Sequence, residues 1–185
     1  IAYTCRKKTG KAYSLSTDSD IYLYDIETGD EVNLCKLSDT DINAGYDINP
    51  LFSPDGKYIA WQSMERDGYE SDKNRLYVMD LDTKQKHDLF ADFDQSVESM
   101  VWNSDSNGLF FISTQHGTCQ IYELTGLVNP EIRKITDGVH DYAWADQIDE
   151  TRLAGLRHSM SSPNELYVID IQSGAQRQIT FENTT

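Results

Sequence analysis

The sequence lacks a long hydrophobic run, an excess of positive charge and any closely spaced pair of cysteines. Without roughly 20 consecutive apolar residues no segment qualifies as a membrane-spanning helix, so we expect no membrane partner. Its 16 basic and 31 acidic residues give a formal net charge of −15, which repels a phosphate backbone, so we expect no nucleic acid partner. At 185 residues the chain is long enough to fold as one domain that buries about 70% of its unfolded surface.

Motifs for metals and cofactors are also lacking. Cys5, Cys35 and Cys119 show no CxxC spacing, and their odd number leaves at least one thiol free or paired outside the chain. No HExxH motif is present, and the four histidines lie far apart along the chain. We therefore expect no metal site and no cofactor. The histidines are His87, His116, His140 and His158.

One segment, DTDINAGYD, resembles a calcium-binding loop only in part. Asp39, Asp41 and Asn43 stand at alternate positions, but Ala44 replaces the glycine and Pro50 the bidentate glutamate that such a loop needs. A polar connector between repeats is the favoured interpretation, with calcium as the alternative.

The sequence also contains no GxSxG, P-loop or GxGxxG motif, so we expect no catalytic residue in it.

Four segments repeat a pattern of strand, turn and strand. Each begins with alternating apolar and polar residues, passes through a turn such as ETG or QSG, and ends in a second strand, which predicts a hairpin. Their tyrosines, Tyr22, Tyr77, Tyr122 and Tyr167, lie 55, 45 and 45 residues apart. The segments are DIYLYDIETGDEVNL, RLYVMDLDTKQKHDL, QIYELTGLVNPEIRKIT and ELYVIDIQSGAQRQIT.

Three further segments interleave with these hairpins and place Phe52, Trp102 and Trp144 at positions that we interpret as equivalent. Each is followed by a polar turn, such as SPDG, and a second apolar run. Each repeat is then four antiparallel strands, which is typical of a β-propeller blade. We predict an all-β fold, a β-propeller arc of about four blades, with three complete blades and a first blade that lacks its innermost strand.

The predicted blades cover residues 1–40, 41–92, 93–137 and 138–185, the last running into a linker. The apolar residues from Leu89 to Met100 also have the spacing of a helix. Because the repeat requires an inner strand from Val97 to Trp102, a helical turn fits only near residues 91–95.

The stretch FSPDGKYIAWQSMERDGYESDKNRLYVMDL resembles the propeller of the dipeptidyl peptidase V group of the prolyl oligopeptidase family, as do SDIYLYDIETG before it and FDQSVESMVW, TDGVHDYAW and RHSMSSPNELYVID after it. The resemblance covers essentially the whole chain. SPDGK is shared with many TolB-type propellers, whereas SMERDGYESD before a strand is more specific. The resemblance implies a serine peptidase, usually secreted or periplasmic, that removes dipeptides from the amino end of peptides. Its triad lies in an α/β-hydrolase domain that we expect beyond this chain.

The acidic loop MERDGYESDKN, residues 64–74, joins the second and third strands of a predicted blade. Because antiparallel strands alternate in direction, it emerges on the face where the chain leaves the last blade, which is the side of the expected hydrolase domain and the peptide substrate. Carboxylates there suit a substrate's terminal ammonium. The candidate substrate-binding residues are Glu65, Arg66, Asp67, Tyr69, Glu70 and Asp72.

In this hypothesis at least one of the four carboxylates anchors the ammonium, Tyr69 forms a wall or donates a hydroxyl, and Arg66 orients the substrate or binds its carbonyl. The alternative is that Glu65, Arg66 and Asp72 pair internally and hold the loop against the hydrolase domain. Two other loops join second and third strands. We expect CRKKTGKAYSLSTDS to be a solvated basic loop, with contact to an acidic interdomain surface as the alternative, and RHSMSSPN to look toward the substrate chamber.

Three functions remain open from the sequence. The favoured one is a noncatalytic propeller that gates access and helps to bind the amino end of peptide substrates. The others are a TolB-like module that binds a protein and a purely structural propeller. An arc of about four blades leaves apolar surfaces between blades unpaired, so we also expect the 185-residue chain to self-associate.

Overall fold

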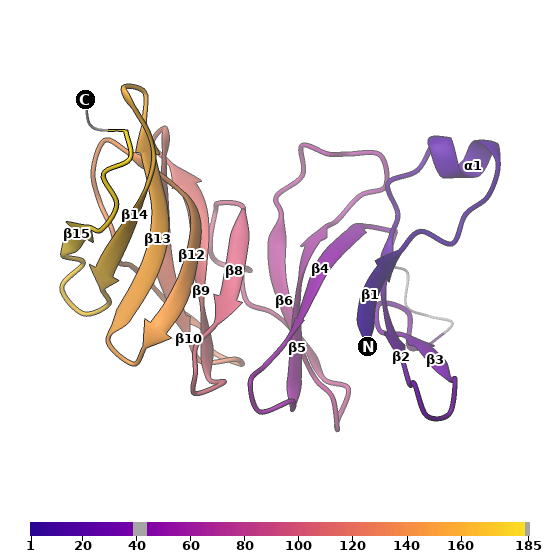
Figure 1. The fold of residues 1–185 in the computed structure, drawn as a ribbon. Coiled ribbons are helices and arrows are strands. Elements are labelled where there is room, and N and C mark those ends of the chain that lie inside the picture. Colours follow the sequence, from indigo (N-terminus) through magenta and orange to yellow (C-terminus); the bar gives the residue numbers. More distant parts are fainter. Residues whose placement is uncertain (39–43, 184–185) are drawn as a thin grey trace. The chain divides into compact units, whose positions relative to one another are not determined.

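The structure, a computed structural model, describes residues 1–38 and 44–183. In these residues the strands form one three-stranded and three four-stranded antiparallel sheets, each with its strands paired in chain order (Figure 1). This confirms the predicted all-β propeller arc, with three complete blades and a first blade of three strands. The calcium-like positions Asp39, Asp41 and Asn43 lie outside the described residues.

The first two sheets belong to the amino-terminal half of the chain. The first contains β1 (Ala2–Cys5), β2 (Asp20–Tyr24) and β3 (Glu31–Asn33). The second contains β4 (Tyr46–Phe52), β5 (Tyr58–Met64), β6 (Arg75–Asp80) and β7 (Lys86–Asp88).

The last two sheets follow in the same order. The third contains β8 (Ser99–Trp102), β9 (Gly108–Gln115), β10 (Thr118–Thr125) and β11 (Glu131–Lys134). The fourth contains β12 (Asp141–Asp149), β13 (Arg152–Ser159), β14 (Ser162–Asp170) and β15 (Gln176–Gln178). The sheets alone do not fix where one blade ends and the next begins, so the blade ranges given above stay a prediction.

Helix is scarce in the described chain. The short helix α1 (Lys11–Ser14) lies in the connection from β1 to β2, where none was predicted. Residues 91–95, where a helical turn was allowed, form turns and a bend, and β8 supplies the inner strand that the repeat required. No helix of the described residues is long and apolar enough to cross a membrane.

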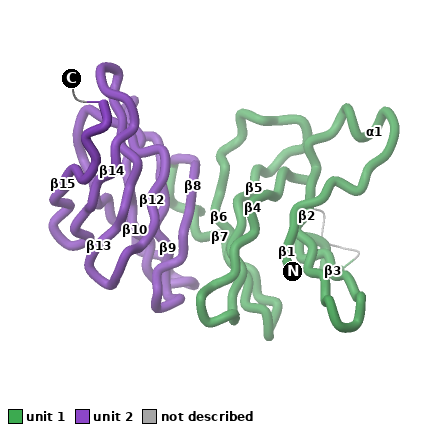
Figure 2. Tube along the Cα trace, viewed as in Figure 1, with its two compact units in different colours: residues 1–94 green, residues 95–185 purple. Residues whose placement is uncertain are grey.

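The chain divides into two compact units, Ile1–Asp94 and Gln95–Thr185, each built around two sheets (Figure 2). The core of unit 1 includes Ile21, Leu34, Ile59, Trp61 and Met79, and so joins the first sheet to the second. A parallel bridge between Ser19 and Tyr46 links the same two sheets. The core of unit 2 joins the third sheet to the fourth in the same way. Its larger side chains are Phe110, Ile112, Ile121, Tyr142, Leu153 and Ile169.

The repeated tyrosines occupy the same place in every sheet, on β2, β6, β10 and β14. In the first three sheets each stacks on an aromatic ring of the preceding strand, with ring centroids 5.3 to 5.8 Å apart. In the fourth sheet Tyr167 instead lies opposite Gly155. A Cβ atom on Gly155 would lie 2.8 Å from Cε1 of Tyr142, so this ring requires glycine there. The guanidinium of Arg157 covers Tyr167, 4.2 Å from the ring centroid.

The turns of the outer hairpins in the first, second and fourth sheets share one construction. Asp25, Asp80 and Asp170 each accept backbone N–H bonds at Oδ1 from residues two or three further on, which closes the turn. The fourth residue after each aspartate has a positive φ: 78° at Gly29, 62° at Lys84 and 69° at Gly174. The ETG and QSG motifs thus supply glycine where the backbone is left-handed.

One predicted equivalence is wrong. Phe52 and Trp102 each pair with a residue of the second strand of their sheet. That residue pairs in turn with the buried residue that lies two positions after the repeated tyrosine. In the fourth sheet that place belongs to Gln147, which pairs with Leu153, and not to Trp144. The reason is that a shorter turn joins β12 to β13 and two bulges interrupt the pairing of β12, so the repeat slips by several residues.

Candidate functional site

The acidic loop connects β5 to β6 and is folded as two successive turns. The N–H of Tyr69 donates to the carbonyl of Arg66 at 3.3 Å, and the N–H of Asp72 donates to the carbonyl of Tyr69 at 3.2 Å. Gly68 takes a φ of 78°, a left-handed conformation that favours glycine. The segment ERDGYE therefore has a defined conformation, in which the aspartate and the glutamate side chains have different surroundings.

Asp67 fastens this loop to the connection between β1 and β2. Its carboxylate accepts the backbone N–H of Thr17 at 2.7 Å, that of Asp18 at 3.2 Å and the hydroxyl of Ser16 at 2.8 Å. The ammonium of Lys8 lies 3.4 Å away. The Ser16 hydroxyl, followed by the backbone donors, lowers the pKa of Asp67 to about 2. Asp67 is thus occupied within the molecule.

Arg66 and Asp72 form a second internal contact. The Nε of Arg66 donates to both carboxylate oxygens of Asp72 at 3.0 Å, its terminal nitrogen bonds Oδ1, and its backbone N–H donates to Oδ2 at 2.9 Å. The Arg66 side chain lowers the pKa of Asp72. The guanidinium also lies 4.1 Å from the ring centroid of Tyr69. These three residues therefore brace the loop against itself.

The two glutamates are less occupied. Glu65 has an exposed side chain and lies 3.7 Å from a terminal nitrogen of Arg75, which also lies 3.8 Å from Asp88. Glu70 is exposed, and within the described residues no hydrogen bond or ion pair involves its carboxylate. An approaching cation would meet these two carboxylates first, because Asp67 and Asp72 already have donors.

The structure treats the six predicted residues unequally. It brings Arg66, Tyr69 and Asp72 together, as the internal-pairing alternative required for Arg66 and Asp72, but it pairs Glu65 with Arg75 instead. The expectation of a solvated loop between β1 and β2 is wrong for its second half, since Ser16, Thr17 and Asp18 bind Asp67. No sequence signal linked these partners, because they lie about 50 positions apart.

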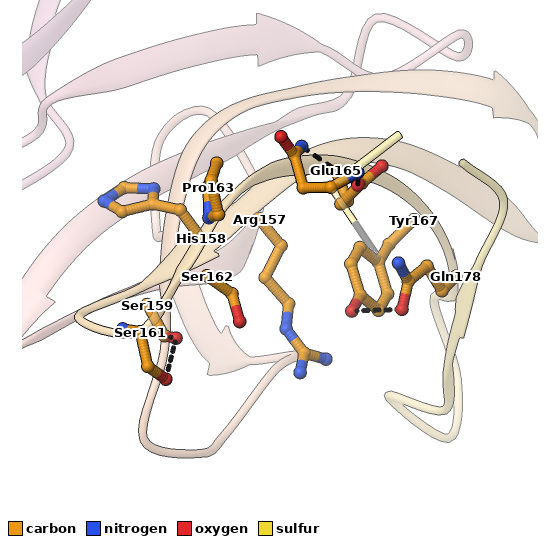
Figure 3. A pocket seen from close by; sticks show the side chains of 10 residues that line it. Arg157, His158, Ser159, Ser161, Ser162, Pro163, Glu165, Tyr167 and Gln178 are labelled. Atoms are coloured by element: carbon orange, nitrogen blue, oxygen red, sulfur yellow. Dashed lines mark hydrogen bonds between the residues drawn. The ribbon is translucent and has the colours of Figure 1, made fainter. Parts of the chain in front are cut away.

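A polar pocket of about 170 Å³ lies in unit 2, beside the turn from β13 to β14 (Figure 3). The guanidinium of Arg157 lies beside the Tyr167 ring and donates to Oε1 of Gln176 at 2.9 Å. Glu165 is occupied by the Thr180 hydroxyl, which lowers the pKa of Glu165, and by the backbone N–H of Asn183 at 2.8 Å. The pocket presents donors suited to a carbonyl or carboxylate group.

His158 contributes little to the interior of this pocket. Its imidazole points away from the Arg157 guanidinium in Figure 3, and its Nε2 lies 4.0 Å from Oδ2 of Asp141. Its Nδ1 is buried, and among residues 1–38 and 44–183 it has no hydrogen-bond partner. The expectation that the RHSMSSPN segment looks toward substrate stays a prediction.

The four sheets and their repeated tyrosines define a segment of a β-propeller. The chain is 45% identical over 183 residues to dipeptidyl-peptidase 5 of Porphyromonas gingivalis, a match that covers 99% of this chain and 26% of that protein. It is 48% identical over 183 residues to dipeptidyl-peptidase 5 of Porphyromonas endodontalis, with the same coverage. These relatives confirm the resemblance to the dipeptidyl peptidase V group. The chain spans 26% of the length of these curated relatives.

No protein-family model matches the chain. Among solved structures, acylaminoacyl peptidase of Pyrococcus horikoshii matches with a TM-score of 0.70 at 24% identity, covering 98% of this chain and 25% of that one. TolB from Acinetobacter baumannii matches with a TM-score of 0.65 at 23% identity, covering 97% and 40%. Both likenesses show the propeller fold alone, because a peptidase and TolB share it.

Proposed function

We propose that this chain is the noncatalytic propeller part of a serine dipeptidyl peptidase, where it gates access to the substrate chamber and helps to bind the amino end of peptides. Catalysis belongs to an α/β-hydrolase domain of the same protein, and the enzyme works in the periplasm or outside the cell. The identity to two proteins named dipeptidyl-peptidase 5 supports this proposal. So does the acidic loop that joins second and third strands.

The observation that carries the proposal is the division of the loop's carboxylates. Asp67 and Asp72 hold the loop in shape, while Glu65 and Glu70 remain exposed. A loop held in advance loses little conformational entropy when a ligand binds. A substrate ammonium placed between two carboxylates forms charge-assisted hydrogen bonds, which are stronger once the hydrolase domain excludes water.

The test is steady-state hydrolysis of a dipeptidyl chromogenic substrate by the full-length enzyme carrying Glu65→Gln, Glu70→Gln or both. A hydrogen bond to a charged group contributes roughly 1.5–3 kcal/mol, so we expect kcat/KM to fall about 10-fold or more, mainly through KM. Glu27→Gln, in the exposed ETG turn of the first sheet, is the matched control and should leave both constants unchanged. Unchanged kcat and KM in the double variant would contradict the proposal that these glutamates anchor the substrate's ammonium.

A TolB-like protein-binding module is the second candidate, and the TolB likeness favours it to the extent that fold alone can. One simple observation distinguishes the two functions. A GxSxG motif in the same gene supports the peptidase, and peptide hydrolysis by the full-length protein decides for it. A full-length protein without hydrolytic activity would favour the binding module.

We further propose that the 185-residue chain by itself self-associates through the fourth sheet. Trp144, Leu156 and Leu166 are cross-strand neighbours on one face, and Ile179 donates its N–H to the carbonyl of Leu166. Trp144, Leu166 and Ile179 are each exposed by about 40%. Such an apolar row is stabilised when a second copy covers it. Light scattering should show a dimer or larger species that Leu166→Glu converts to a monomer, and a monomeric wild-type chain would contradict the proposal.

A further inference from the structure

Three buried side chains from separate strands meet in unit 1. Asp20 is the first residue of β2, Cys35 follows β3, and Asp47 lies in β4. One oxygen from each carboxylate and the Cys35 sulfur all lie within 4.8 Å of one another. The residues are only 6%, 1% and 1% exposed. We propose that this Asp20–Cys35–Asp47 cluster is a metal site that takes a zinc ion.

An unsatisfied oxygen on Asp20, one of the three residues, is a separate indication of a ligand. Oδ1 of Asp20 is buried and has no hydrogen-bond partner in the described structure. The residue as a whole is only 6% exposed to solvent. Its other oxygen, Oδ2, accepts from Nδ2 of Asn33 at 2.8 Å and from the Lys36 ammonium at 2.9 Å. A buried carboxylate oxygen without a partner is destabilising, and a bound cation supplies the missing interaction.

Each of the three groups also has a donor behind it that fixes its orientation. The N–H of Ile21 donates to the Cys35 sulfur at 3.3 Å, and Nε1 of Trp61 donates to Oδ1 of Asp47 at 2.8 Å. Asn33 does the same for Asp20. Such outer donors hold metal ligands in place and tune their basicity, and they commonly accompany real metal sites.

The charges and ligand types favour zinc. Two carboxylates and a thiolate carry three negative charges, which a divalent cation and the neighbouring Lys36 ammonium together balance. Calcium and magnesium prefer oxygen ligands throughout, whereas zinc accepts sulfur and oxygen in one tetrahedral site. Zinc bonds of roughly 2.0–2.3 Å place ligand atoms about 3.5 Å apart, which is compatible with three atoms that all lie within 4.8 Å of one another, and water completes the site as fourth ligand.

The consequence for the fold is a metal link between the first and second sheets of unit 1. The ligands lie 15 and 12 positions apart along the chain and in no recognised motif, which is why the sequence predicted no metal site. This inference is independent of the peptidase proposal, because the cluster lies among core residues of unit 1 rather than in the acidic loop.

The test is titration of the reduced, metal-free 185-residue chain with Co²⁺, a spectroscopic substitute for zinc. We expect a thiolate-to-cobalt charge-transfer band in the near ultraviolet that saturates at one equivalent and disappears on addition of Zn²⁺. Cys35→Ala should abolish the band, and Cys5→Ala, the matched thiol control from the same unit, should retain it. The absence of a band in the folded wild-type chain, or its persistence in Cys35→Ala, would overturn the proposal.

A second variant keeps the test decisive where Cys35→Ala does not fold. Asp20→Asn has the same shape as the natural side chain but lacks the charge, and circular dichroism reports whether it folds. We expect its Co²⁺ affinity, measured from the same band, to fall at least tenfold. An affinity equal to that of the wild type would show that the carboxylate is not a ligand.

Discussion

Replacing Asp67 with alanine is expected to release the connection between β1 and β2 from the acidic loop. Oδ1 of Asp67 accepts the N–H groups of Thr17 and Asp18 at 2.7 and 3.2 Å, and Asp67→Ala removes the acceptor of both bonds at once. A hydrogen bond to a charged group contributes roughly 1.5–3 kcal/mol when shielded from water. Because the Asp67 side chain is 34% exposed, we expect the two bonds together to contribute about 2 kcal/mol to local opening.

Backbone hydrogen exchange measures this local opening directly. A loss of about 2 kcal/mol corresponds to a roughly 30-fold faster exchange of the Thr17 and Asp18 amides. Asp72→Ala is the control, because among the described residues the Asp72 side chain accepts its hydrogen bonds from Arg66, within its own loop, and its loss should leave those two amides unchanged. Exchange rates in Asp67→Ala within twofold of the wild type would refute the anchoring role of this carboxylate.

The same contact predicts a dependence on pH. The pKa of Asp67 is lowered from 3.8 to about 2 in the folded protein, so its contribution is complete above about pH 4 and is lost as the pH falls through 2. The amide resonances of Thr17 and Asp18 should therefore titrate with a midpoint near pH 2. A midpoint near 3.8 would show that Asp67 is not held by these donors.

The remaining predictions concern three glycines, and urea unfolding of each variant measures its free energy of unfolding. Gly174→Ala and Gly29→Ala each place a side chain at a positive φ, which destabilises by about 1 kcal/mol, but only the Cβ at Gly174 meets a backbone oxygen, 2.2 Å from that of Ile135. We expect Gly174→Ala to lose about 1–3 kcal/mol more, and equal losses would contradict the close approach. Gly155→Ala forces a Cβ to 2.8 Å from the buried Tyr142 ring, with a similar expected loss, and an unchanged unfolding midpoint would show that the ring has room to move.

The sequence predicted the sheets well because the repeated tyrosines mark a constant structural place. Tyr22, Tyr77, Tyr122 and Tyr167 all lie on the last strand but one of their sheets, so their spacing determined the number of blades and the order of strands. The alignment of Trp144 failed because bulges in β12 change the register without changing the apolar pattern.

The candidate site was less predictable because its contacts join distant parts of the chain. The pairing of Arg66 with Asp72 is local and could be anticipated as an alternative. The contact of Asp67 with Thr17 spans about 50 positions, and the meeting of Asp20, Cys35 and Asp47 depends on how two sheets pack. Periodicity locates strands, but it does not indicate which polar side chains meet between them.

Binding of a substrate's terminal ammonium by Glu65 and Glu70 can be tested with the substrate's own amino group. The most direct measurement compares, in the full-length enzyme, kcat/KM for a dipeptidyl substrate with a free amino group and for the same substrate N-acetylated, before and after the double substitution Glu65→Gln and Glu70→Gln. We predict a strong preference for the free amino group in the wild type that falls about 10-fold or more in the double variant. A preference that survives the double substitution intact would contradict the account.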